Sequence, residues 1–158
     1  MKVTAIALMG SDLFDYVADR LGNDKDYTVL FNLCNQENKI LKSNVNMNEI
    51  DLIVVDISLF AGACEENILS SIYAGTAQNE DGFPPDYLMI YNNENAEEVV
   101  WINDILLKRK ITMTSVCLND EADKVIVAQN IRGIIKRQIN EKKRFSIMDN
   151  EMRKIQEY

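Results

Sequence analysis

The stretch DLIVVDISLF, residues 51–60, decides the fold of this chain. Its apolar residues 52–55 follow one another without a break between Asp51 and Asp56. An unbroken apolar run of this length is typical of a central strand in a parallel sheet, because both faces of such a strand are buried. Helices must then cover both faces of the sheet. The stretch therefore predicts an α/β fold and places Asp56 at the carboxyl end of a central strand.

The rest of the chain alternates between strand-like and helix-like patterns. We expect strands at 3–9, 27–33, 51–57, 86–91 and 111–118 and helices at 10–22, 64–75, 96–110 and 119–144. Residues 35–49 predict a short irregular helix or a loop, and residues 76–85 predict a loop. Strands that alternate with helices imply right-handed crossovers and one parallel sheet. The order predicts a three-layer α/β sandwich with five parallel strands in the flavodoxin-like order 2-1-3-4-5. We expect one domain over residues 1–144 and a C-terminal helical extension over 145–158.

Composition excludes several classes of function. The chain has 158 residues, which suits one domain, and a net charge of −8, which disfavours general binding of nucleic acid. It contains no histidine, so Ser-His-Asp and Cys-His catalysis are excluded. Its three cysteines form no C-x-x-C motif and fit a reduced, cytoplasmic protein better than a disulfide framework. We find no signal-peptide pattern and no apolar run long enough to insert into a membrane.

Polar residues follow most of the predicted strands. Ligands of an open parallel sheet bind at the carboxyl ends of its strands, so these residues form the candidate binding rim. The rim residues are Gly10, Ser11, Asp12, Asp56, Ser58, Asn92 and Asn119. A plainer interpretation of Asp56 is also open, because aspartate is common where a strand ends and its side chain bonds nearby backbone amides.

DLIVVDISLF resembles the third strand of a response-regulator receiver domain, and the layout of residues 2–140 is similar to that family. The resemblance implies that Asp56 occupies the phosphoacceptor position, that Asp12 lies near the acidic pair that holds Mg²⁺, and that Asn92 stands near the usual Thr or Ser. By this resemblance Asp12 and Asp56 would be the metal ligands, and Mg²⁺ would be needed only if Asp56 is phosphorylated; otherwise we expect no cofactor.

The sequence also departs from the receiver pattern at two places. Residues 9–12 read MGSD where receivers have an acidic pair, and residues 115–120 read SVCLND where receivers have a Lys that is usually followed by Pro. Phosphoryl transfer needs a metal and a cation that neutralise developing charge. The resemblance is therefore to a degenerate, pseudo-receiver domain, which implies a regulatory or protein-interaction module without turnover of its own.

A second resemblance leads to an enzyme. DLIVVDIS together with GACEENILSSIYAG, residues 62–75, is weakly similar to the nucleoside deoxyribosyltransferase and TIR-like group. That resemblance implies that Glu65 or Glu66 attacks or stabilises the anomeric carbon of a nucleoside or NAD, with Asp56 beside it. The alternative interpretation is that Glu65 and Glu66 lie in the first turn of a helix, where the helix dipole stabilises them.

The C-terminal helix predicts an interaction surface. Ile139, Met148, Met152 and Ile155 would form an apolar face on a helix that runs past the sheet, and such a face is normally covered. The basic segment KRQINEKKR, residues 136–144, is typical of a solvated helix face. We therefore expect a homodimer, or a contact with a protein partner, through residues 131–158.

Overall fold

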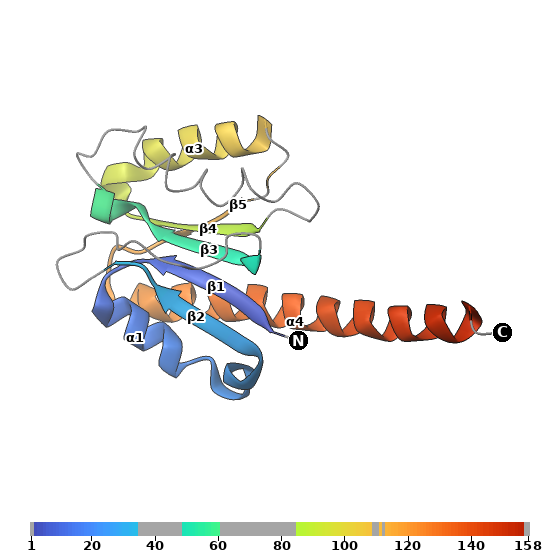
Figure 1. Cartoon of the computed structure of the whole chain (residues 1–158). Coiled ribbons are helices and arrows are strands. Elements are labelled where there is room, and N and C mark those ends of the chain that lie inside the picture. The colour runs from blue at the N-terminus through green and yellow to red at the C-terminus, as the bar shows by residue number, and fades with distance from the viewer. Residues whose placement is uncertain (1, 35–48, 61–84, 109–110, 112, 157–158) are drawn as a thin grey trace.

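A computed structural model describes residues 2–34, 49–60, 85–108, 111 and 113–156 of the chain. The described part contains one five-stranded sheet in which every neighbouring pair of strands is parallel, in the order β2-β1-β3-β4-β5 (Figure 1). The strands are β1 (Val3–Leu8), β2 (Thr28–Asn32), β3 (Leu52–Asp56), β4 (Asp86–Tyr91) and β5 (Met113–Cys117). The flavodoxin-like strand order predicted from the sequence is confirmed.

Helices lie on both faces of the sheet. Helices α1 (Ser11–Asp19) and α4 (Lys124–Gln156) cover one face, and α3 (Ala96–Lys108) lies over the other (Figure 1). Short 3-10 helices occupy Gly22–Tyr27, Ile57–Phe60, Asn93–Asn95 and Glu121–Asp123. The three-layer sandwich is therefore confirmed for the described residues, whereas the predicted helix at 64–75 and the segment at 35–48 lie outside them.

Two helix boundaries differ from those predicted. The first helix ends at Asp19, before the predicted stop at Gly22, and Gly22 adopts a left-handed conformation (φ +58°) at the start of a 3-10 helix. The last helix begins at Lys124 and not at residue 119, after the 3-10 turn Glu121–Asp123. It then runs without interruption to Gln156, so residues 145–156 continue the same helix that packs on the sheet.

The core follows from the alternation of side chains along the strands. Ala5, Val54 and Leu88 face α1 and α4, and their neighbours in sequence, Ile6, Val55 and Met89, face α3. All five residues of β3 are buried; the unbroken apolar run predicts this for residues 52–55, and Asp56 is buried with them. Each aliphatic side chain buried in this way stabilises the fold by roughly 1.5–3 kcal/mol.

A polar network at the amino ends of the strands holds α4 on the sheet. Lys142 Nζ lies 2.8 Å from Asp51 Oδ2 and 2.7 Å from the carbonyl oxygen of Lys2. Arg137 and Gln138 both donate to Asp86 Oδ2, at 2.8 Å and 2.6 Å, and Gln138 also donates to the carbonyl oxygen of Asp51. These contacts fix the direction of α4 up to Lys142, and the helix beyond that residue leaves the sheet (Figure 1).

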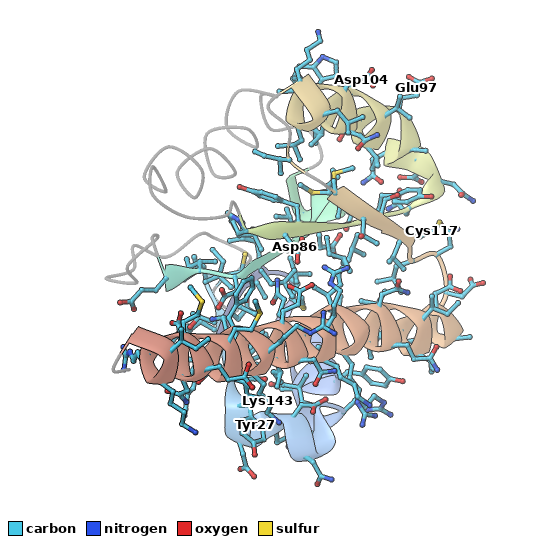
Figure 2. The ribbon with its side chains drawn as sticks, turned by 90° about the vertical axis from the view of Figure 1, so that its right-hand side faces the viewer. Tyr27, Asp86, Glu97, Asp104, Cys117 and Lys143 are labelled. Atoms are coloured by element: carbon cyan, nitrogen blue, oxygen red, sulfur yellow. The ribbon has the colours of Figure 1, made fainter. Side chains whose placement is uncertain are left out.

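A further contact holds the other side of α4. Lys143 Nζ lies 4.7 Å from the centre of the Tyr27 ring, on the side of the helix away from Asp86 (Figure 2). Such a cation–π contact at an exposed site contributes roughly 0.5–1 kcal/mol. Among the described residues, Lys142 and Lys143 are therefore the last side chains that fasten α4 to the body. No described helix, α4 included, combines the length and the apolar character needed to cross a membrane.

Candidate functional site

Asp56 ends β3 and is almost fully buried, with 8% of its surface exposed. Its Oδ1 accepts two hydrogen bonds from Ser58, one from the backbone nitrogen at 3.1 Å and one from the hydroxyl at 2.6 Å. The side chain thus bonds the backbone of the 3-10 helix that follows the strand, as aspartate commonly does at a strand end. Sequence analysis placed Asp56 and Ser58 in one rim, and the structure brings them into direct contact.

Burial raises the pKa of Asp56 above its ordinary value, and the two hydrogen bonds from Ser58 oppose that rise. Cys34, which follows β2, is also buried, and its environment includes the same carboxyl group. Burial raises the pKa of the Cys34 thiol, and the negative charge of Asp56 raises it further. The thiol is therefore held neutral and is a poor nucleophile.

The end of β1 is joined to the end of β2 by Asn32, which sequence analysis did not single out. Its Nδ2 donates to the carbonyl oxygen of Met9 at 2.9 Å, and its Oδ1 accepts from the backbone nitrogen of Cys34 at 3.2 Å. No pattern within the local sequence indicates this role, because Met9 lies 23 positions away from Asn32. The contact ties together the carboxyl ends of β1 and β2.

The rim residues after β1 are placed differently from Asp56. Gly10 precedes α1 in an extended conformation (φ −61°, ψ 151°) and forms no side-chain cap. Ser11 and Asp12 occupy the first turn of α1 and are exposed to solvent. Asp12 favours the helix at this position because the amino end of a helix carries a partial positive charge.

Asn92 and Asn119 serve as local connectors in the structure. Asn92 Oδ1 accepts from the backbone nitrogens of Glu94 and Asn95, at 2.9 Å and 3.2 Å, and Asn95 Oδ1 accepts from the backbone nitrogen of Asn92 at 2.7 Å. This reciprocal arrangement is a capping box, and the N-x-x-N spacing in the sequence is its signal. The amide oxygen of Asn92 is therefore already bound to the backbone.

Asn119 links the ends of β4 and β5. Its Oδ1 accepts from the backbone nitrogen of Asn93 at 3.0 Å, and its Nδ2 donates to Cys117 Sγ at 3.1 Å. Asp123, another residue that sequence analysis did not single out, accepts from the backbone nitrogens of Asn119 and Asp120. These two bonds lower the pKa of Asp123. The polar groups at this end of the rim are thus occupied by backbone and side-chain partners.

The described residues do not suit Mg²⁺. Mg²⁺ takes hard oxygen ligands in near-octahedral geometry and usually binds more than one carboxylate. Within the described ranges no group of three or more His, Cys, Asp and Glu side chains is placed to hold a metal ion. Asp56 is buried with its Oδ1 bound to Ser58, whereas Asp12 stands on an exposed helical turn. The described residues therefore support no chemistry through a metal. Glu65 and Glu66 lie outside these residues.

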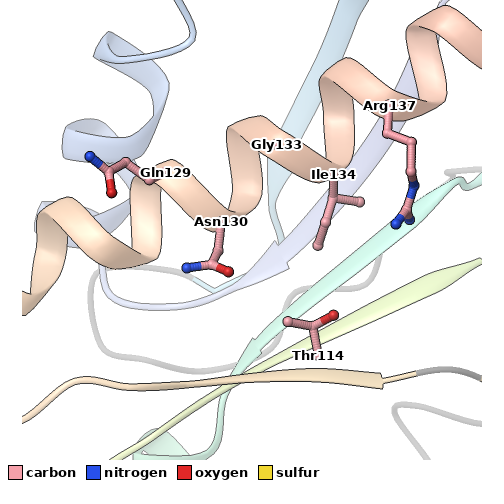
Figure 3. A pocket seen from close by; sticks show the side chains of 6 residues that line it. All are labelled: Thr114, Gln129, Asn130, Gly133, Ile134 and Arg137. Carbon is pink, nitrogen blue, oxygen red and sulfur yellow. The ribbon is translucent and has the colours of Figure 1, made fainter.

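An open cavity of about 370 Å³ lies between the edge strand β5 and α4 (Figure 3). Its lining residues are Thr114, Gln129, Asn130, Gly133, Ile134 and Arg137. The lining is mixed, with amide and guanidinium groups beside the aliphatic side chain of Ile134. The sequence does not predict this cavity, because it depends on how β5 and α4 pack against each other.

The end of α4 carries apolar side chains that nothing in the described part of the chain covers. Ile139, which the sequence predicted on this face, is instead buried in the core, with 4% of its surface exposed. We call Phe145, Met148, Met152 and Ile155 the apolar stripe; each is between 53% and 71% exposed. Ile147 is exposed to a similar degree, 60%, on the same helix. Large apolar side chains are thus gathered on the projecting end of α4.

The chain was compared with models of protein families, with curated proteins and with solved structures, and none of the three comparisons found a match. The fold is flavodoxin-like on the strength of its strand order and layers. The receiver and deoxyribosyltransferase resemblances therefore rest on the sequence motifs alone.

Proposed function

We propose that this protein is a non-catalytic, receiver-like interaction module that forms a homodimer through the end of α4. The observation that carries the proposal is the apolar stripe on residues 145–155, which projects from the body with more than half of each side chain exposed (Figure 1). While these side chains face water, the segment gains no stability from burial of apolar surface. Packing against a second helix would supply the stability that the segment lacks.

The candidate rim supports a module that does not turn over substrate. Asp56, Asn92 and Asn119 each use a side-chain oxygen to bond neighbouring groups of the same chain. Catalytic groups normally need atoms that are free to meet a substrate or to transfer a proton. The regulatory part of the proposal rests on the receiver resemblance, in which Asp56 occupies the position of the phosphoacceptor.

The rigid attachment of α4 supports a defined dimer. Asp51 and Asp86 hold Arg137, Gln138 and Lys142 by contacts of 2.6–2.8 Å. The projecting segment continues from this fixed point without a break. It is therefore presented in one direction, which reduces the entropy lost when a second helix binds.

The proposal is tested by light scattering on the full chain and on two variants. Met148→Glu places a charge within the apolar stripe, and Ile147→Glu places the same charge on an equally exposed neighbour outside the stripe. We expect wild type and Ile147→Glu to have the mass of a dimer and Met148→Glu the mass of a monomer. A monomeric wild type at its highest soluble concentration, or a Met148→Glu variant that stays dimeric, would overturn the proposal.

One observation favours the enzyme alternative. Asp56 is a buried carboxyl group with a raised pKa at the carboxyl end of a central strand, and perturbed pKa values gather at active sites. In that alternative Asp56 and Glu65 or Glu66 process a nucleotide or nucleoside. Chromatography of NAD or a deoxynucleoside after incubation with wild type and with Asp56→Asn tests it. Release of free base by wild type alone would support the enzyme.

A further inference from the structure

We propose that the two copies of α4 pack in parallel and in register along the apolar stripe, with Arg144 of each copy beside Asp149 of the other. This inference rests on the homodimer proposed above and adds its direction and its register. It follows from three features of the helix: the spacing of the stripe, the charges beside it and the surface into which it continues.

The stripe has the spacing of a coiled coil. Its residues follow one another at steps of three, four and three, which correspond to positions a, d, a and d of a heptad. At these positions side chains of one helix insert between those of a second helix. Ile147 falls outside this pattern, on another side of the helix, and so would stay exposed in the dimer.

Charge complementarity selects the parallel arrangement. Arg144 directly precedes the first stripe residue and Asp149 directly follows the second, which places them at positions g and e. In a parallel coiled coil, position g of one helix lies beside position e of the next heptad in the other helix. We call the line along which the two apolar stripes meet the seam. The parallel arrangement sets Arg144 of one copy against Asp149 of the other on both sides of the seam, and both residues are exposed.

The two antiparallel arrangements are less favourable. In the first antiparallel arrangement, every stripe residue of one helix packs against a stripe residue of the other. Asp149 and Glu151 of one copy then lie beside Asp149 and Glu151 of the other, so like charges meet. In the second antiparallel arrangement, one helix is shifted by one heptad along the other. Met152 then faces Glu141 of the other copy, and Ile155 faces Gln138. Gln138 is buried and already binds Asp51 and Asp86, so it offers no apolar surface to a partner.

The same side of α4 leads back to the cavity beside β5. Counting back from Phe145 by four, four and three residues gives Glu141, Arg137 and Ile134. Arg137 and Ile134 line the cavity between α4 and β5 (Figure 3). A parallel second helix thus follows the side of α4 that borders this cavity, where Arg137 is exposed and Ile134 is buried in the core.

Basic residues near the seam do not oppose this arrangement. In a parallel pair, Arg137 of one copy would lie near Lys142 of the other, but each of these side chains is bound to a carboxylate of its own chain. Arg137 pairs with Asp86 at 2.8 Å, and Lys142 pairs with Asp51 at 2.8 Å. The repulsion between them is therefore largely neutralised within each copy.

The test uses two charge reversals in the full chain, Arg144→Asp and Asp149→Arg. Each variant alone sets like charges on both sides of the seam, so we expect its dimer to dissociate on the order of tenfold more readily than wild type. In an equimolar mixture, the introduced aspartate of one variant faces the introduced arginine of the other on one side of the seam, and the native Arg144 faces the native Asp149 on the other side. We expect the mixture to form heterodimers about as tight as the wild-type dimer, measured by sedimentation equilibrium with one variant labelled by fluorescence.

The outcomes separate this inference from the homodimer itself. In the shifted antiparallel register Arg144 would meet Glu151 and Asp149 would meet Lys142, so mixing the two variants would not restore the dimer. A dimeric wild type with no restoration on mixing overturns the parallel register and leaves the homodimer standing. A monomeric wild type overturns both. Circular dichroism of each variant shows whether the exposed substitutions leave the fold intact, as we expect.

Discussion

The hydroxyl of Ser58 lies 2.6 Å from Oδ1 of Asp56, and the backbone nitrogen of Ser58 lies 3.1 Å from the same oxygen. The two bonds tie the carboxyl group at the end of β3 to the turn that follows it. They act against the effect of burial, which raises the pKa of Asp56. The buried carboxylate of Asp56 is therefore bound to the backbone and the hydroxyl of Ser58, two residues further along the chain.

We expect Asp56→Asn to raise the free energy of unfolding at neutral pH. The folded protein holds the proton of Asp56 more tightly than the unfolded chain does. At a pH below 3.8, the ordinary pKa of an aspartate, residue 56 is protonated in both the folded and the unfolded protein, so its ionisation does not affect stability. As the pH rises above 3.8, Asp56 ionises first in the unfolded chain, and this ionisation stabilises the unfolded state. The free energy of unfolding of wild type therefore falls as the pH rises from 3.8 to the raised pKa of Asp56, whereas Asp56→Asn shows no such fall.

Urea unfolding at a series of pH values measures this difference. Asp15→Asn, which changes an exposed aspartate on α1, is the matched control and should follow wild type at every pH. The gain from Asp56→Asn should shrink as the pH falls toward 3.8. A gain that is the same at all pH values would mean that burial of the charge is not its cause.

We expect Ser58→Ala to destabilise the fold at neutral pH by about 1.5–3 kcal/mol, the usual range for a hydrogen bond to a charged group. The variant keeps the backbone bond to Asp56 and loses the bond from the hydroxyl. Because that bond lowers the pKa of Asp56, its loss should move the pH window of the preceding experiment upward. Ser58→Thr retains the hydroxyl and should remain close to wild type in both measurements.

Acetyl phosphate with Mg²⁺ should leave wild type unmodified at Asp56. The described residues offer no cluster of acidic ligands for the metal, and the segment SVCLND has no lysine to neutralise the charge of the transferred group. Intact-mass spectrometry checks this result, with Asp56→Asn as the control. An added mass of about 80 Da on wild type alone would identify Asp56 as a working phosphoacceptor.

The sequence predicts the strands well because their signals are local. Residues 52–55 are apolar without a break, and burial on both faces of β3 follows directly from that run. The carboxyl-end rim is also predictable, since parallel strands end at one edge. What individual rim residues do is less predictable: Asn92 joins a capping box whose spacing is visible in the sequence, yet its asparagine partner, Asn95, is not the usual Glu or Gln.

The remaining contacts depend on residues that only the fold brings together. Asn32 binds Met9 across 23 positions, and Lys142 binds Asp51 across 91 positions. No periodicity or motif encodes such pairs, because either residue alone has many equivalent partners on the surface. The roles of Gly10, Ser11 and Asp12 in binding stay predictions, as do those of Glu65 and Glu66.

The network at the base of α4 predicts a loss of stability in Asp86→Ala. Asp86 Oδ2 accepts from both Arg137 and Gln138, and Gln138 is buried. Removal of the carboxylate leaves these donors without that partner, which costs about 1–3 kcal/mol. Asp104 on the outer side of α3 provides the control, because Asp104→Ala changes an exposed aspartate (Figure 2). Thermal unfolding that is equal for the two variants would contradict this role of Asp86.

Oxidation should weaken the proposed dimer. Met148 and Met152 are each more than half exposed within the apolar stripe, whereas Met9 and Met89 are buried in the body. Dilute peroxide should therefore convert the first two to sulfoxides well before the other two, and a sulfoxide is polar where the seam is apolar. We expect peroxide-treated wild type to dissociate at concentrations where the untreated protein is dimeric.

The double variant Met148→Leu with Met152→Leu separates oxidation of the stripe from damage elsewhere. Leucine keeps the apolar character of both positions and cannot be oxidised, so the variant should form a dimer before and after peroxide treatment. Light scattering measures the mass, and peptide mass spectrometry locates the added oxygen. If the double variant dissociates after treatment as wild type does, the loss arises from oxidation outside the stripe, and the expectation that oxidation of Met148 and Met152 weakens the dimer is wrong.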